Sequence, residues 1–289
     1  MPKIFSPQTI LQVPDHIQKY ISNPDLFAGF MQLSGRVFRD VPGRKTMQIK
    51  LGEHSYFIKQ HFGVGWGEIA KNLVIGKKPI ISAMTEVKAI QKLSEIGIAT
   101  TPLVAYGQRG SSPANLQSFV LTEDLGDIVS LEDICADPKT YPMTVQTKQL
   151  MLKAVAGLAT KLHGAGQGLA PDLAASLASV HRDFYFCHFA LQRQHAKVNQ
   201  YDLYLVDLHR MLLNQAPNGN AVMKDIAGFY FSAMQNGFSA DELDIFKQHY
   251  LEQTDAFWRQ VNKRASQLFN KYNSAKLIQQ RAQQPPFVR

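Results

Sequence analysis

The chain has 289 residues, 45% hydrophobic and 19% charged, which is enough for one large domain or two closely joined lobes and excludes a disordered or collagen-like chain. Its two cysteines, Cys135 and Cys187, cannot form a disulfide framework and favour a reducing compartment. The net charge of +8 arises largely at the end of the chain, because residues 258–289 contain seven basic residues and no acidic one.

Strand patterns and one helical pattern dominate the first third of the chain. Apolar and polar residues alternate in a hairpin pattern that ends at Lys59, and a glycine-punctuated stretch with no predicted element follows over residues 61–78. Apolar residues at helical spacing then lead to a stop at Gly97. The predicted elements are a hairpin over residues 47–59, a helix over 85–96 and strands at 103–106 and 118–121.

From residue 130 onward the apolar spacing is mostly helical. A short apolar strand ends directly before Asp207, and we find no internal repeat and no long linker. The predicted elements here are helices over 150–163, 225–234, 240–250 and 257–272 and a strand at 204–206. The sequence therefore predicts an α+β fold of two lobes, with a β-rich N-lobe over residues 1–124 and a mostly helical C-lobe over 125–289.

Five chemically active positions follow one another in a characteristic order. Lys59 ends a strand and Glu86 begins the next helix. The triplet His181-Arg182-Asp183 comes later, with His188 five residues beyond Asp183, and Asp207 follows a short strand. Each residue alone has a common structural explanation, such as a solvated surface charge or a turn cap. In combination, their order is that of protein-kinase-like phosphotransferases, so we expect a protein-kinase-like two-lobed fold.

Phosphoryl transfer explains why these residue types are needed. A fixed cation must hold the nucleotide phosphates, a role for Lys59 if Glu86 keeps its flexible ammonium in place. An oxygen ligand must hold Mg²⁺, a role for Asp207. A carboxylate must also orient the attacking hydroxyl and accept its proton, a role for Asp183. The pattern therefore predicts an enzyme that uses ATP and Mg²⁺.

The loop that covers the phosphates in protein kinases has no clear equivalent. The turn at residues 41–46 contains one glycine, so Arg44 and Lys45 are candidates to supply charge where backbone amides usually would. A plain hairpin turn explains these two residues equally well. The glycine cluster at residues 63–67 follows Lys59 instead of preceding it and is not assigned this role.

Other candidate positions have competing explanations. Asp225 matches the kinase position that braces the catalytic loop, and it equally suits an acid in the first turn of a helix. His181, His188 and His209 imitate a metal site, but their setting fits the kinase interpretation better. Hydrolase, zinc-protease and P-loop motifs do not occur, and Cys187 is predicted to be packed.

Several segments together resemble the lipopolysaccharide core heptose kinases. The resemblance runs from about residue 33 to about residue 250 and is carried by residues 36–39, 55–59, 63–68, 131–133, 181–189, 206–210 and 224–226. It implies a kinase-like fold that transfers the γ-phosphate of ATP to heptose I of the inner core, on an acceptor in the cytoplasmic leaflet.

The resemblance also implies residue roles. Lys59 contacts the phosphates with Glu86 paired to it, Asp183 is the base and Asp207 binds Mg²⁺. His188 lies where protein kinases carry a metal-binding asparagine, and the family resembled has histidine there too. One departure is residues 165–180, which are longer than expected before the His181 triplet and are interpreted as an insertion.

Alternative functions remain open from the sequence. Another acceptor, such as 3-deoxy-octulosonic acid or a small aminated sugar, suits the same fold. A non-catalytic kinase-like protein that binds membranes is a different class, although Lys59, Glu86, Asp183 and Asp207 together argue against it. Binding of nucleic acid is not expected, because no recognition module accompanies the positive charge.

The expected location follows from the absence of targeting patterns and from the basic C-terminus. No signal peptide is predicted, nor a run of about 18 apolar residues that could span a membrane, so we expect a cytoplasmic protein. The predicted helix over 257–272 has an apolar stripe and a basic face. This face is either simply solvated or meets an anionic partner, namely the inner-leaflet surface on which the lipid A-core saccharide lies, or an acidic protein.

Overall fold

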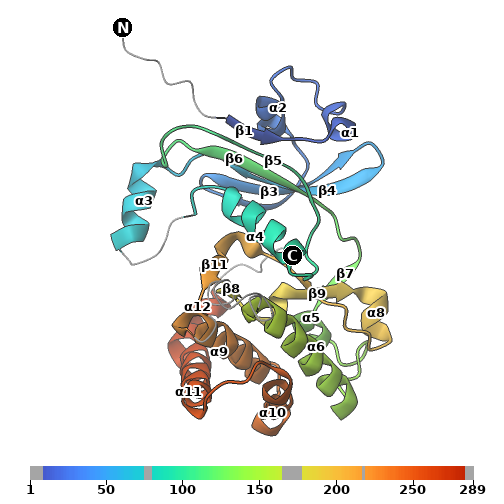
Figure 1. Ribbon diagram of the computed structural model, residues 1–289, viewed down its shortest axis with the longest axis vertical. Coiled ribbons are helices and arrows are strands. Elements are labelled where there is room, and N and C mark those ends of the chain that lie inside the picture. The colour runs from blue at the N-terminus through green and yellow to red at the C-terminus, as the bar shows by residue number, and fades with distance from the viewer. Residues whose placement is uncertain (1–8, 75–79, 165–177, 217–218, 284–289) are drawn as a thin grey trace, which may run out of the picture. The chain divides into compact units, whose positions relative to one another are not determined.

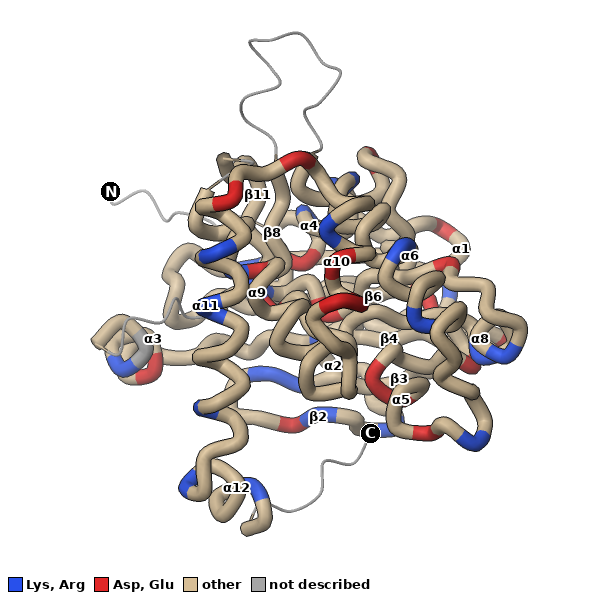
Figure 2. Tube along the Cα trace, turned by 90° about the horizontal axis from the view of Figure 1, so that it is seen from below, with Lys and Arg blue, Asp and Glu red and all other residues tan. Residues whose placement is uncertain are grey.

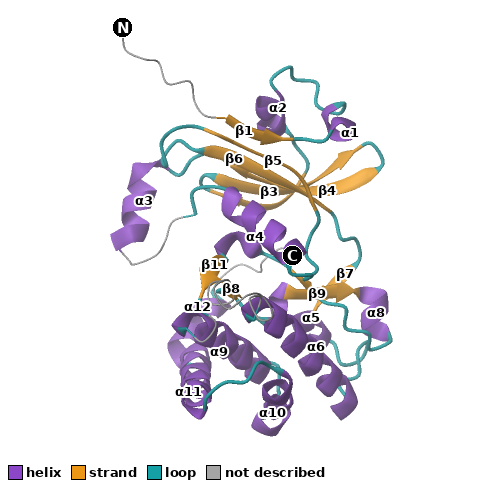
Figure 3. Ribbon diagram, viewed as in Figure 1, coloured by secondary structure: helices purple, strands orange, loops and turns teal. Residues whose placement is uncertain are grey.

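The computed structural model describes residues 9–74, 80–164, 178–216 and 219–283 (Figure 1). The chain forms two compact units. Of the described residues, the first unit takes in those from 9 to 91 together with 101–124, and the second takes in residues 92–100 and those from 125 to 283. Strands dominate the first unit and helices the second (Figure 3).

A six-stranded antiparallel sheet forms the first unit, in the order β1-β5-β6-β4-β3-β2. Its strands are β1 (Thr9–Gln12), β2 (Arg36–Val41), β3 (Arg44–Leu51), β4 (His54–His61), β5 (Leu103–Arg109) and β6 (Gln117–Glu123). The helices that begin in this unit are α1 (Asp15–Gln18), α2 (Leu26–Gln32), α3 (Gly65–Val74) and α4 (Met84–Glu95).

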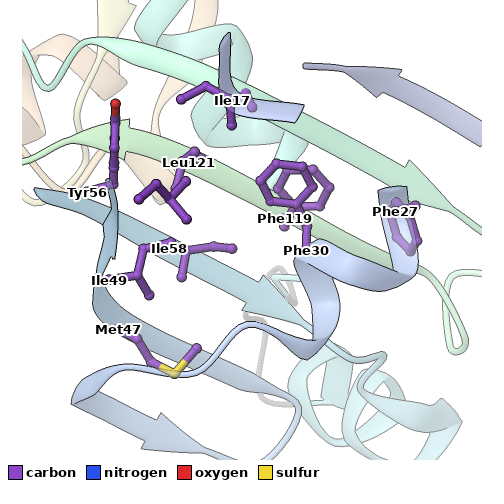
Figure 4. Close-up of a cluster of buried hydrophobic side chains, with 11 residues drawn as sticks. Ile17, Phe27, Phe30, Met47, Ile49, Tyr56, Ile58, Phe119 and Leu121 are labelled. Carbon is purple, nitrogen blue, oxygen red and sulfur yellow. The ribbon is translucent and has the colours of Figure 1, made fainter. Parts of the chain in front are cut away.

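The core of this unit lies between one face of the sheet and the helices α1 and α2 (Figure 4). Strand side chains alternate between the two faces of a sheet, and in β4 Ile58 is fully buried in this cluster. Phe30 of α2 stacks on Phe119 of β6, with ring centroids 4.4 Å apart. Because Ile58 points into the core, the next residue, Lys59, points to the opposite face of the sheet.

The second unit is mostly helical, with short strands in two small sheets of order β10-β9-β7 and β11-β8. Its strands are β7 (Ile128–Ser130), β8 (Ala178–Val180), β9 (Phe189–Gln192), β10 (Tyr204–Leu205) and β11 (Leu212–Gln215). Its helices are α5 (Leu131–Ala136), α6 (Val145–His163), α8 (Arg193–Lys197), α9 (Asn220–Gln235), α10 (Ala240–His249), α11 (Asp255–Tyr272) and α12 (Ala275–Ala282). Two single 3₁₀ turns, η1 (Phe186–His188) and η2 (Leu208–Arg210), complete it.

Aromatic side chains from several helices form the centre of the second unit. Phe229 of α9 lies 4.6 Å from Phe246 of α10 and 5.5 Å from Phe186 of η1, measured between ring centroids. All three rings are fully buried. This cluster fixes α9 and α10 relative to the segment that follows Asp183, because large buried rings have few alternative arrangements.

The expected α+β architecture is correct, but several elements differ from the prediction. No element was assigned to residues 61–78 from the sequence, and α3 occupies Gly65–Val74 there. Its Gly65 and Gly67 have low intrinsic helix propensity, which conceals the helix in the sequence. The terminal helix α12 was also missed. Of the expected insertion, residues 165–177 lie outside the described residues, and Ala178–Val180 form β8.

The final long helix, α11, packs along most of its predicted stripe, but Tyr272 at the end of the stripe is 40% exposed. Phe257, Val261 and Ala265 are buried, and Phe269 is half-buried. Blue segments recur along α11 and α12 in Figure 2, and the exposed basic residues there are Arg259, Lys263, Lys271 and Lys276. In the described part of the chain, no helix is both long and apolar enough to cross a membrane.

Candidate active site

In the first unit, Lys59 and Glu86 form a close ion pair. Lys59 lies on β4, and its Nζ is 2.6 Å from Oε1 of Glu86, in the first turn of α4. The Glu86 side chain is 5% exposed, whereas that of Lys59 is 28% exposed. Glu86 Oε2 is buried with no hydrogen-bond partner among the described residues. The pair therefore fixes the ammonium on a rigid strand while leaving part of Lys59 open to a ligand.

The turn that carries Arg44 and Lys45 is a tight hairpin between β2 and β3. Lys45 Nζ lies 3.2 Å from Asp40 Oδ2 across the hairpin. Arg44 and Lys45 help to line a hollow of about 390 Å³, together with Asp40, Val41, Pro42, Gly43 and Phe62. Two cations beside an open hollow are compatible with an anionic ligand, and the same turn is also an ordinary hairpin.

In the second unit, Asp225 braces the loop that precedes Asp183. Its carboxylate, which is 1% exposed, accepts hydrogen bonds from the backbone N–H groups of His181 (2.6 Å) and Arg182 (2.8 Å). Arg182 adopts a left-handed conformation, with φ of 74°. Such a conformation costs about 1–3 kcal/mol in a non-glycine residue and persists only when its surroundings hold it. The alternative interpretation is wrong, because α9 begins at Asn220 and Asp225 is not in its first turn.

A histidine that the sequence analysis did not assign supports Asp225 from the other side. His163, at the end of α6, is fully buried, with Nε2 3.5 Å from Asp225 Oδ2 and Nδ1 2.9 Å from the hydroxyl of Tyr250. The only available signal was a polar residue at an apolar position directly before the helix stop at Gly164.

The Asp183 carboxylate is held by Arg210. Arg210 Nη1 donates to both carboxylate oxygens, at 2.7 and 2.8 Å. The side chain of Asp183 is 19% exposed, so it is within reach of a substrate. The backbone carbonyl of Asp183 is fixed separately, because it accepts from Nδ1 of His188 at 2.6 Å and from the N–H of Tyr185 at 2.8 Å. Burial, followed by the charge of Asp183, raises the pKa of Tyr185.

Asp207 itself has a left-handed backbone conformation, and its side chain lies beside His188. Asp207 has φ of 62° and directly precedes η2. Its Oδ1 contacts Nδ1 of His209, and its Oδ2 lies 3.7 Å from Nε2 of His188. A carbonyl oxygen can only accept, so the His188 nitrogen at the Asp183 carbonyl carries a proton. The other ring nitrogen therefore faces the Asp207 carboxylate.

His181 links the loop that carries Asp183 to the segment that precedes Asp207. It is buried, its Nε2 donates to the carbonyl of Val206 at 2.9 Å, and its Nδ1 has no partner among the described residues. Burial, aided by the neighbouring His188, lowers the pKa of His181. A neutral ring with one proton, on Nε2, satisfies this arrangement, so His181 holds the residue directly before Asp207.

The donor atoms beside Asp207 include its own carboxylate and a ring nitrogen of His188. Among the described residues, no group of three or more His, Cys, Asp or Glu side chains is placed to hold a metal ion. Mg²⁺ is commonly held by one or two carboxylates with waters and substrate phosphates completing its shell. The Asp207 carboxylate fits that requirement. The ring nitrogen of His188 is a softer ligand, although its Nδ1–H···O=C contact is typical of a metal-binding histidine.

Together, these features define the class of the protein. The β-rich unit has a strand lysine paired with a helix glutamate, and the helical unit has a braced loop with Asp183, which His188 links to Asp207. These are the parts of a protein-kinase-like phosphotransferase. The chain belongs to the lipopolysaccharide kinase (Kdo/WaaP) family, whose model matches residues 28–250. The resemblance seen in the sequence is thereby confirmed.

Characterised relatives share most of their length with this chain. The lipopolysaccharide core heptose(I) kinase WaaP of Pseudomonas aeruginosa is 37% identical over 228 residues, which cover 78% of this chain and 81% of the relative. The enzyme of the same name from Escherichia coli K12 is 34% identical over 227 residues, with the same coverage. A solved structure, WaaP in complex with acyl carrier protein, is similar to this chain, with 28% identity and a TM-score of 0.70. The match covers 90% of this chain and 99% of the chain in that structure.

Proposed function

We propose that this chain is an ATP-dependent kinase that phosphorylates heptose I of the lipopolysaccharide inner core. The observation that carries the catalytic part is the hydrogen-bonded loop pair, in which Asp225 fixes the backbone before Asp183 and His181 fixes the backbone before Asp207. The acceptor is inferred from the relatives, which are named heptose(I) kinases.

In this proposal, the residues of the first unit act on the nucleotide. Lys59 neutralises charge on the phosphates of ATP, and Glu86 keeps the Lys59 ammonium in place. Arg44 and Lys45 add positive charge from the β2–β3 turn. The close Lys59–Glu86 pair supports the first two roles, since an ammonium held at 2.6 Å loses little freedom when a phosphate binds.

In the second unit, Asp183 orients the acceptor hydroxyl and takes its proton as the oxygen attacks the γ-phosphorus. The bond from the γ-phosphorus to the β–γ bridging oxygen breaks, and ADP leaves. Asp207, with His188 as the second group, would hold Mg²⁺, which supplies positive charge to the transferring phosphoryl group. The partly exposed Asp183 carboxylate supports the base role, because a base must be accessible to the hydroxyl.

A second acceptor deserves a direct test, because the matching family is described as Kdo/WaaP. A 3-deoxy-octulosonic acid residue offers a hydroxyl to the same base but carries a carboxylate next to its ring. A non-catalytic role is less well supported, because a protein that merely binds membranes has no need for the buried Asp225 brace or for an accessible Asp183.

We infer a cytoplasmic protein on the anionic inner leaflet, where ATP and the lipid A-core acceptor are both available. The exposed basic side chains of α11 and α12 support this location, since each Lys or Arg near such a surface contributes about 1 kcal/mol. The relative solved with acyl carrier protein supports a protein partner for this chain as well.

The testing experiment incubates the purified protein with labelled ATP, Mg²⁺ and one of three acceptors. These are dephosphorylated core-lipid A, an acceptor ending in 3-deoxy-octulosonic acid, and free heptose. Transfer to core-lipid A alone supports the proposal, whereas preference for the second acceptor would reassign the substrate.

Asp183→Asn removes the proposed base and is expected to lower transfer by roughly 10²- to 10⁴-fold while ATP binding persists. Asp127→Asn is the matched control, because Asp127 is a 76% exposed acid of the same unit that pairs with Arg193. Turnover of Asp183→Asn close to that of the unmodified protein would remove Asp183 from the mechanism.

A further inference from the structure

Arg210 is an unassigned residue in direct contact with the proposed base. Among the described residues, it is the one hydrogen-bond partner of the Asp183 carboxylate, and a single nitrogen, Nη1, serves both oxygens. The backbone of Asp183 is anchored elsewhere, through its carbonyl. Without Arg210 the loop would keep its course, but the carboxylate would be free to rotate about its side-chain bonds.

The position of Arg210 is fixed by the same turn that presents Asp207. The η2 turn directly follows Asp207 and ends at Arg210, and its first residue, Leu208, is 1% exposed. The N–H of Met211 closes the turn by donating to the Leu208 carbonyl at 3.0 Å. A buried leucine and a closed turn leave the segment little freedom. The orientation of the Asp183 carboxylate therefore depends on the turn that directly follows Asp207, the proposed magnesium ligand.

We propose that Arg210 is a positioning residue for phosphoryl transfer, which holds the Asp183 carboxylate in the orientation needed to meet the acceptor hydroxyl. This inference rests on the proposed function, because it takes Asp183 as the base. A guanidinium suits the task better than an ammonium, since its planar donors have a fixed direction and it never deprotonates.

Positioning has a distinct kinetic signature. Misplacement of a reacting group by about 1 Å can cost roughly 100-fold in rate, so Arg210→Gln is expected to lower kcat roughly 10- to 100-fold. The KM for ATP should stay within about 2-fold, because Arg210 acts through Asp183 and is assigned no contact with the nucleotide. Arg210→Lys keeps the charge and one donor, and should recover part of the loss.

The decisive measurement is a double-mutant cycle with Asp183→Asn. If Arg210 acts only through Asp183, the double variant should be no more than about 2-fold slower than Asp183→Asn alone. A multiplicative loss in the double variant would show that Arg210 acts independently, and an unchanged kcat in Arg210→Gln would show that it has no role. Either result overturns the proposal.

Two controls separate this proposal from folding and from the proposed function. Arg193→Gln is the matched control, because Arg193 is also 40% exposed and lies 2.8 Å from an aspartate. Its side chain contacts Asp127 and Tyr141, whereas that of Arg210 contacts Asp183. The Arg193→Gln variant should keep the parent kcat, and both arginine variants should keep the parent melting temperature within a few degrees. Added guanidinium should also raise the rate of Arg210→Ala several-fold, which a purely structural defect would not allow.

The same cycle can be run on the slow hydrolysis of ATP, in which water replaces the sugar hydroxyl. This makes the test independent of the acceptor. Parent-like turnover in Asp183→Asn contradicts the proposed mechanism itself, whereas an impaired Asp183→Asn beside a fully active Arg210→Gln contradicts only the role of Arg210.

Discussion

Glu86 illustrates how a single residue depends on its one partner. Its carboxylate is almost completely buried, and Lys59 supplies the hydrogen bond to Oε1, while Oε2 has no partner among the described residues. Burying a charge without a partner is strongly unfavourable. The pair therefore acts as a unit, because neither residue keeps its position or charge environment when the other is removed.

This interdependence leads to a prediction at the residue scale. Lys59→Ala, Glu86→Ala and the double variant should each lose about the same amount of kcat/KM, because effects within one unit are non-additive. The measurement is steady-state transfer at several ATP concentrations. Losses that multiply in the double variant would indicate separate roles for the two side chains.

The β2–β3 hairpin shows how an element constrains its sequence. Gly43 has φ of 78°, and a Cβ atom there would lie 2.9 Å from the carbonyl oxygen of Gly63. The segment that follows β4 approaches so closely that the N–H of Phe62 donates to the carbonyl of Gly43 at 2.9 Å. Glycine at position 43 is thus required both by the turn and by this approach.

We expect Gly43→Ala to destabilise the protein by more than Gly97→Ala. Gly97 also has a positive φ, of 67°, but nothing lies within 4 Å of its would-be Cβ, so only the conformational cost of about 1–2 kcal/mol applies. At Gly43 the contact with the Gly63 carbonyl adds to that cost. Denaturant unfolding of both variants measures the difference. Equal losses would show that the close approach relaxes without cost.

At the scale of the whole molecule, the net charge of +8 comes largely from basic residues near the C-terminus, and several of these side chains on α11 and α12 are exposed. The apolar stripe of α11 packs inside the second unit, whereas Arg259, Lys263, Lys271 and Lys276 remain exposed. Packing and attraction thus use different sides of the same segment. Several basic residues acting together at an anionic surface have a measurable effect, although one alone has little.

Replacing these four residues with glutamine should leave the melting temperature nearly unchanged, because their side chains contribute no buried contacts. Binding to anionic vesicles should weaken, and activity on membrane-embedded acceptor should fall at moderate salt. Co-sedimentation with vesicles over a salt series provides the measurement. Equal binding by the quadruple variant, or binding of the parent that salt does not affect, would leave α11 and α12 only a packing role.

The sequence by itself determined the order of chemical groups along the chain and the kind of element on which each lies. Lysine on a strand, glutamate on a helix and aspartates after apolar segments are local patterns, since side-chain periodicity and turn chemistry act over a few residues. These patterns were sufficient to predict the kinase-like architecture and the family. The apolar pattern of α11 also predicted the buried Phe257 and Val261, but not the exposure of Tyr272.

The tertiary structure alone decided which groups meet across long stretches of the chain. Arg210 reaches Asp183 from 27 residues away, and His163 reaches Asp225 from 62 residues away. No periodicity encodes such contacts, because they depend on left-handed turns at Arg182 and Asp207 that only the surrounding packing can hold. The helix α3 was missed for a local reason, because its Gly65 and Gly67 have low helix propensity and conceal it in the sequence.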